Sequence, residues 1–141
     1  MSLTVTVVVP ADAETTWRHW TDFAAWPQWN PNCVEATVDG PLAEGTRLDL
    51  RLRHPGGRDF YTRPRLVEVQ PAHSVAWQAR SLGLRATTRT LLESEHDGTR
   101  VTITADAVGP LALPYKLAVT DRTQALIYVA MLDALTDRLR A

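Results

Sequence analysis

The stretch that decides the fold runs from Val7 to Pro31 and reads VVVPADAETTWRHWTDFAAWPQWNP. It holds four of the chain's five tryptophans. Indole rings bury a large apolar area, so this many in one short stretch require a large apolar surface to pack against. That surface is either a solid core or the wall of a cavity, and the rest of the chain must decide between the two.

The residues around this stretch predict a strand followed by short helices. Residues 3–9 place leucine and valine on one face and mainly threonine on the other, which is typical of a strand. Asp12 is expected to cap a helix over residues 13–22. A second short helix is expected over residues 23–29, ending at Asn30-Pro31.

The middle of the chain predicts six more strands joined by turns. Each strand alternates apolar and polar residues, and turn sequences such as His96-Asp97-Gly98 separate them. Pro64 falls inside the third of these strands and indicates an edge position or a bulge. Strands that follow one another by hairpins form an antiparallel sheet. The six expected strands cover residues 34–38, 48–52, 60–69, 75–79, 86–94 and 101–107.

After Gly109-Pro110 the apolar period changes from that of a strand to that of a helix. Leucine and valine recur three residues apart from Leu126 to Leu135, which predicts one helix over residues 121–140. Its start stays open, because Pro114 also suits a first helical turn. A twisted antiparallel sheet has one face to bury, and this helix is the only large element available to cover it.

Length and charge narrow the class of protein. A chain of 141 residues fits one domain over 1–141, and its net charge of −1 argues against a general nucleic-acid or anionic-membrane binder. The single cysteine, Cys33, allows no internal disulfide. No apolar run approaches the length of a membrane span, and the N-terminus lacks the pattern of a signal peptide. We therefore expect a cytoplasmic protein without stable membrane insertion.

Ordered short motifs run along nearly the whole chain: VPADAETTW (9–17), Thr21-Asp22-Phe23, Trp29-Asn30-Pro31, Pro71 with Trp77, Gly98–Val101 and Gly109-Pro110-Leu111. Together they give a family resemblance. The chain resembles the START-like polyketide cyclase/dehydrase superfamily, also called SRPBCC. The resemblance implies an α+β helix-grip fold: a seven-stranded antiparallel sheet wrapped around a long C-terminal helix, with two short helices between strands 1 and 2. It also implies a cavity between sheet and helix for an apolar or aromatic small molecule.

Side-chain size along the strands favours a cavity over a solid core. The positions expected to face the helix are large on the earlier strands, as at Leu50 and Phe60, and small or mildly polar on the later ones, as at Ala79 and Ala86. Native interiors pack at a density of about 0.74, so such a gap is not left by accident. The alternative is a filled core with surplus threonine.

The candidate ligand-binding residues combine apolar walls with a few hydroxyl groups. Trp26 is expected near the entrance as a gate. Tyr128 is expected on the inner helix face, where it either hydrogen-bonds a ligand or is a core residue with its hydroxyl at the surface. The candidates are Trp26, Phe60, Thr62, Trp77, Thr88, Thr90, Ala105, Tyr128, Met131 and Leu132.

Signatures of catalysis are weak. The sequence has no metal-ligand spacing and no nucleophile motif, so no metal or cofactor is expected and no catalytic residue is assigned. Arg63 and Arg89 are expected to point outward unless a bulge near Pro64 shifts the register. Many members of the superfamily carry a histidine where this chain has residues 86–90, which weakens any transfer of acid–base roles.

Three functions remain open. The first is binding of a hydrophobic or aromatic small molecule, polyketide- or lipid-like, between sheet and helix. The second is a polyketide cyclase/dehydrase-type enzyme, which would need an acid and a base in the pocket. The third is an interaction module in which the apolar residues 111–115 pair two chains as a homodimer.

Overall fold

The computed structural model describes residues 2–53, 57–118 and 121–140. Its helices and strands are, in chain order, β1 (Ser2–Val9), α1 (Ala13–Thr21), the 3-10 helix η1 (Phe23–Ala25), α2 (Trp26–Trp29), β2 (Cys33–Asp39), β3 (Arg47–Arg53), β4 (Asp59–Thr62), β5 (Arg65–Gln70), β6 (Ser74–Ser81), β7 (Leu84–Glu95), β8 (Gly98–Val108), α3 (Ala112–Ala118) and α4 (Asp121–Arg140).

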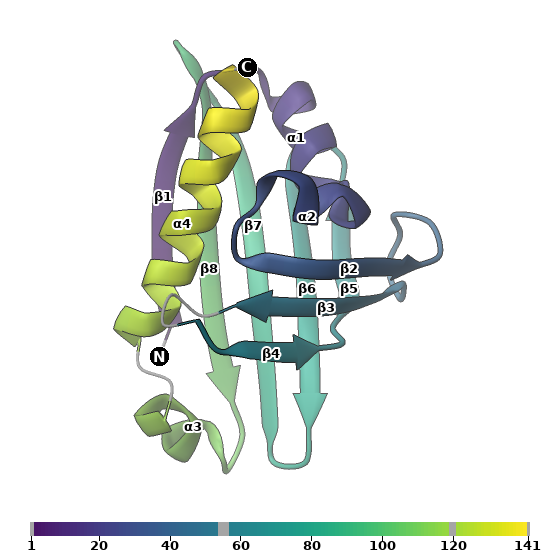
Figure 1. The fold of residues 1–141 in the computed structure, drawn as a ribbon, viewed down its shortest axis with the longest axis vertical. Helices are drawn as coiled ribbons and strands as arrows, with labels where there is room; N and C mark the ends of the chain where they lie inside the picture. Colours follow the sequence, from purple (N-terminus) through teal and green to yellow (C-terminus); the bar gives the residue numbers. More distant parts are fainter. Residues whose placement is uncertain (1, 54–56, 119–120, 141) are drawn as a thin grey trace.

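One antiparallel sheet curls around the last helix. The strand order is β1-β8-β7-β6-β5-β3-β2, and β4 pairs with β3 beside this path. Figure 1 shows β2, β3 and β4 running crosswise to the long strands β6, β7 and β8, while α4 lies along β1 and β8. The short helices α1 and α2 cover one end of the space between sheet and helix. The predicted helix-grip fold is confirmed.

The N-terminal helix begins where the sequence indicates. The side chain of Asp12 accepts a hydrogen bond from the backbone N–H of Thr15 at 2.7 Å, so the predicted cap is confirmed. The hydroxyl of Thr15, together with this backbone hydrogen bond, lowers the pKa of Asp12. The cap fixes the start of α1 and thereby places Trp17 and Trp20 against the sheet, where both are buried.

The predicted strand over residues 60–69 is divided, so the described chain has eight strands rather than seven. β4 ends at Thr62 and β5 begins at Arg65, on either side of Pro64. Proline has no N–H for the ladder, and the Pro64 carbonyl instead accepts from the Leu48 N–H at 2.9 Å. β3 therefore pairs with β4 through residues 50–53 and with β5 only at Arg47.

The C-terminal part contains two helices. Pro114 lies in the separate helix α3, and α4 begins at Asp121, as the apolar spacing predicts. α3 is tied to the turn between β6 and β7, because the Leu111 N–H donates to the Gly83 carbonyl at 2.8 Å. Gly109 makes this approach possible, since its φ is +116° and a Cβ there would lie 2.6 Å from that same oxygen.

Two predictions concern the remaining parts of the chain. The sequence His-Pro-Gly-Gly at residues 54–57 predicts a hairpin turn, which lies largely outside the described residues. No helix in the described ranges is long and apolar enough to span a membrane.

Candidate functional site

A cavity of about 290 Å³ lies between α4 and the concave face of the sheet. Its wall comes from α2, α3, α4 and four strands: β3, β4, β6 and β7. The α4 residues are three or four positions apart and so share one helix face. The lining residues are Trp26, Leu50, Leu52, Phe60, Thr62, Trp77, Ala79, Ala86, Thr88, Tyr115, Gln124, Ile127, Tyr128 and Met131.

A cluster of aromatic rings forms the end of the cavity beneath α1 and α2. The centroids of Trp20 and Trp26 are 5.0 Å apart, and those of Trp26 and Trp77 are 5.9 Å apart. Both buried indole N–H groups of the first pair have partners: that of Trp20 donates to the Thr90 hydroxyl at 3.0 Å, and that of Trp26 to the Trp20 carbonyl at 2.8 Å. This end is therefore rigid, apolar and without spare donors on these two rings.

The polar part of the wall lies where β7, α3 and α4 meet. The hydroxyls of Thr88 and Tyr128 are 3.2 Å apart, and either can donate to the other. Beside them the Gln124 amide donates to the Tyr115 hydroxyl at 3.3 Å. A small hollow of about 50 Å³ continues from these four residues along β7 and β8.

Both tyrosines of the wall stay neutral near pH 7. Burial raises the pKa of Tyr128, and the hydrogen bond from Thr88 offsets only part of this effect. Burial also raises the pKa of Tyr115. Among the fourteen lining residues there is no Asp, Glu, His, Lys or Arg. The cavity therefore offers hydrogen bonds without a formal charge.

Seven of the ten predicted site residues line this cavity. Ala105 lines the small adjoining hollow instead. The hydroxyl of Tyr128 lies 3.2 Å from that of Thr88 rather than at the surface, which removes the alternative of a surface hydroxyl. That this hydroxyl binds a ligand stays a prediction. The seven are Trp26, Phe60, Thr62, Trp77, Thr88, Tyr128 and Met131.

The structure places three of the candidate residues differently from the prediction. Thr90 does not line the cavity, and its hydroxyl accepts a hydrogen bond from the buried indole of Trp20. Leu132 is also fully buried and belongs to the core, since one residue beyond Met131 the helix faces another direction. Trp26 is no gate: its side chain is 0 % exposed and forms part of the inner wall.

Seven lining residues are not among the ten candidates. Four of them lie at strand positions expected to face the helix, namely Leu50, Leu52, Ala79 and Ala86, and the other three are Tyr115, Gln124 and Ile127. Gln124 lies one helical turn before Tyr128, and Ile127 lies one turn before Met131, so helical spacing could have identified both. Tyr115 comes from α3, a helix that the sequence does not separate from α4.

The arginines near the predicted bulge point outward. The Arg63 guanidinium lies 3.5 Å from the Asp49 carboxylate and its side chain is 71 % exposed. Arg89 pairs with Glu68 at 3.3 Å, also on the outer face. Among the described residues no group of three or more His, Cys, Asp and Glu side chains could hold a metal ion.

Comparison with known proteins gives one family and many structural neighbours. The family model described as "Polyketide cyclase / dehydrase and lipid transport" matches residues 1–140. No curated protein matches the sequence significantly.

Solved structures share the fold at low sequence identity. The Zhui aromatase/cyclase from Streptomyces sp. R1128 has a TM-score of 0.82 at 15% identity, covering 99% of this chain and 93% of that one. A START superfamily protein from Mycobacterium smegmatis has a TM-score of 0.76 at 20% identity, covering 99% and 97%.

Larger proteins match in part. The di-domain ARO/CYC BexL from the BE-7585A biosynthetic pathway has a TM-score of 0.82 at 20% identity, covering 100% of this chain and 50% of that one. The chain thus spans half the length of this di-domain protein. At such identities the structural matches establish the fold alone.

Proposed function

Because the chain belongs to the polyketide cyclase/dehydrase and lipid transport family, we propose that it binds a compact, uncharged, mainly apolar small molecule in the cavity beneath α4. The observation that carries this proposal is the make-up of the wall. Apolar and aromatic side chains form most of it, and the hydroxyl pair of Thr88 and Tyr128 lies at one place on it. Apolar pockets with a few placed polar groups are typical ligand sites.

The size of the cavity favours a compact ligand. At about 290 Å³ it lies at the lower end of the roughly 300–1,000 Å³ common for small-molecule pockets. Trp26 and Trp77 present aromatic surface at one end, which suits a flat ring system. A long acyl chain would require the cavity to widen.

The absence of charge on the lining residues favours a neutral ligand. A carboxylate or ammonium group transferred into this wall would lose its hydration without gaining a counter-charge. A carbonyl or hydroxyl oxygen of a neutral ligand can instead accept a hydrogen bond from this wall. Thr88 and Tyr128 carry two O–H groups and use one between themselves, which leaves the other free to donate to the ligand.

Cyclase/dehydrase activity is the alternative. Its support is the family description and the aromatase/cyclase neighbours. Such chemistry needs a proton donor and a proton acceptor near the substrate. The titratable side chains of the described wall are Tyr115 and Tyr128, and burial raises the pKa of both. Neither phenol can act as a base near pH 7, so binding is the better supported function.

A filled cavity tests the binding proposal. Ala86→Phe adds a ring to the space between β7 and α4, while Thr104→Phe adds the same ring to the opposite face of the neighbouring strand β8. Titration with the neutral apolar dye Nile red should show saturable binding to the parent and to Thr104→Phe. Binding should be lost in Ala86→Phe with its far-UV circular dichroism spectrum unchanged. Equal binding by all three proteins would show that the dye binds outside this cavity.

Homodimerisation stays a separate proposal. In the region expected to pair two chains, Leu111 is 50% and Leu113 is 69% exposed. Analytical ultracentrifugation of the parent and of Leu113→Ser tests it. A dimer in the parent that dissociates in the variant is expected, and a monomer at all concentrations would exclude it.

A further inference from the structure

The outer face of the sheet carries a groove that is separate from the proposed ligand cavity. A groove of about 390 Å³ is lined by Arg47, Arg63, Arg65, Val67, Gln78 and Arg80. Four of these six residues are arginines, from β3, β6, β5 and the link before β5. The chain as a whole has a net charge of −1, so this arginine groove (Arg47, Arg63, Arg65 and Arg80) is a local concentration of positive charge.

Two of the four arginines face each other directly. Arg47 on β3 and Arg65 on β5 are cross-strand partners in the sheet register. Like charges directly opposite each other destabilise a pair of strands. The sequence thus places two guanidinium groups where folding alone would favour a neutral or acidic partner.

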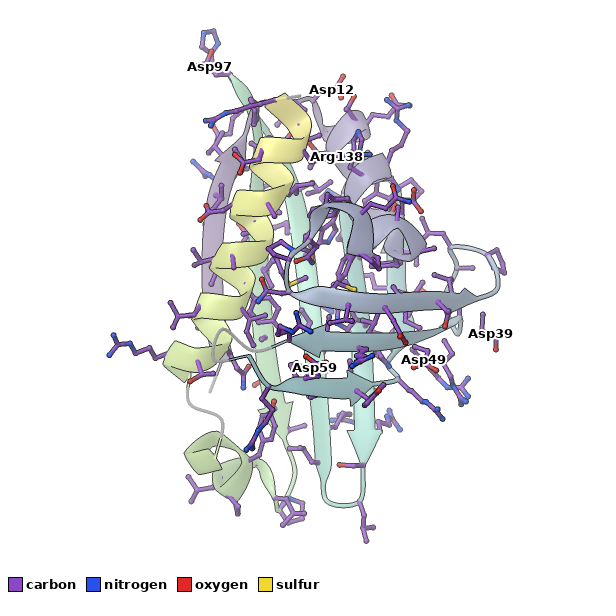
Figure 2. All side chains as sticks on the ribbon, in the orientation of Figure 1. Asp12, Asp39, Asp49, Asp59, Asp97 and Arg138 are labelled. Atoms are coloured by element: carbon purple, nitrogen blue, oxygen red, sulfur yellow. The ribbon has the colours of Figure 1, made fainter. Side chains whose placement is uncertain are left out.

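The protein itself neutralises little of this charge. Arg63 has Asp49 at 3.5 Å, Arg80 donates to the Gln78 side chain at 2.8 Å, and Arg65 donates to the Gly45 carbonyl at 3.5 Å. Arg47 forms no ion pair with any described carboxylate, although Asp39 is its partner on β2. Figure 2 shows Asp39 and Asp49 on the same side of the molecule as a group of nitrogen-tipped side chains.

The other end of β3 shows the contrasting arrangement. Arg51 and Arg53 both lie 2.9 Å from the carboxylate of Asp59, and Arg51 also lies 3.3 Å from Glu35. These arginines lower the pKa of Asp59 through their hydrogen bonds. Both arginines at this end of β3 therefore have carboxylate partners within the sheet. At the arginine groove Asp49 pairs with Arg63, while Asp39, opposite Arg47 in the sheet register, forms no described ion pair with it.

We propose that the arginine groove binds a multivalent oxyanion, such as a phosphate ester or a polycarboxylate. The guanidinium fork presents parallel N–H donors that match the oxygens of phosphate and carboxylate groups. An anion with two or more negative charges between Arg47 and Arg65 would replace their repulsion by attraction. The groove is separate from the cavity, because it opens on the opposite face of the sheet.

Calorimetric titration at constant ionic strength tests the proposal. Pyrophosphate and citrate are compared with sodium chloride, using the parent, Arg47→Gln/Arg65→Gln and the matched control Arg18→Gln/Arg140→Gln. We expect parent and control to bind at least one of the two anions, and the groove variant to bind it at least about tenfold more weakly. A preference for pyrophosphate indicates a phosphoryl ligand, and a preference for citrate indicates a carboxylate ligand.

Two results would overturn the proposal. The first is no binding of either anion beyond the effect of chloride. The second is the same affinity in the groove variant and in the control.

A purely structural role for the arginines is tested in the same samples. Without anion, the groove variant should unfold at the same temperature as the parent or higher, because a like-charge pair has been removed. Nile red binding in the cavity should be unchanged, which separates this site from the proposed one.

Discussion

The two parts of the cavity wall use buried side chains in opposite ways. Beneath α1 and α2, aromatic rings pack tilted or edge to face, and the indole N–H groups of Trp20 and Trp26 are satisfied within the protein. Where β7, α3 and α4 meet, Thr88 and Tyr128 keep hydrogen-bonding capacity next to open space. The first part holds the fold together. The second part has the space and the donors that a ligand needs.

The largest effect should come from breaking the aromatic part. Trp20→Ala removes a fully buried indole that contacts three other tryptophans and leaves the Thr90 hydroxyl without its donor. The free energy of unfolding should fall by roughly 3–5 kcal/mol. Urea denaturation followed by circular dichroism measures it. Trp29→Ala, at a half-buried position of the same cluster, is the matched control and should cost clearly less. Equal losses would mean that the cluster does not depend on Trp20.

A smaller effect should come from the polar part, and it should appear in binding rather than in stability. Tyr128→Phe removes one hydroxyl from the wall while keeping the ring that packs on the sheet. Affinity for a neutral aromatic ketone should fall by about 0.5–1.5 kcal/mol, the value of one net hydrogen bond. Affinity for the corresponding hydrocarbon should stay the same. Calorimetry with both compounds measures this difference, and an equal change for both would remove Tyr128 from ligand recognition.

The smallest effect should be seen at high pH. The pKa of Tyr128 is raised above its ordinary value of 10.0, so the folded protein holds this proton more tightly than the unfolded chain does. The stability that this proton contributes is complete below the ordinary pKa and is lost as the pH rises through the folded-state pKa. From about pH 9 to 11, the parent should therefore lose stability more steeply than Tyr128→Phe. Parallel slopes in urea titrations would contradict the burial of this phenol.

The sequence predicts what depends on local pattern. The cap at Asp12, the turn at residues 96–98 and the span of α4 all follow from neighbours within a few residues, and the structure confirms them. The apolar spacing that predicts α4 does not define its buried face, because Leu126 and Val129 are exposed. The inward small residues Ala79 and Ala86 also follow from strand alternation, and they line the cavity. The size pattern along the strands therefore carries real information about the hollow.

Local sequence patterns do not predict features that depend on contacts between distant segments. Thr90 points inward as predicted, but Trp20, seventy residues earlier, takes its hydroxyl. Tyr115 reaches the wall only because α3 is tied to the turn at Gly83, which no local signal indicates. The division at Pro64 has a local signal, yet pairing of β3 with both β4 and β5 is a property of the whole sheet.

We propose that the cavity beneath α4 binds an uncharged ligand. Quenching of tryptophan fluorescence during titration at pH 7 with 2-acetylnaphthalene, and in parallel with 2-naphthoate, tests it most directly, because Trp26 and Trp77 lie in the wall. The two compounds share one ring system and differ in charge. We expect saturable quenching by the ketone and little or none by the carboxylate. Binding of the carboxylate as tightly as the ketone would contradict it.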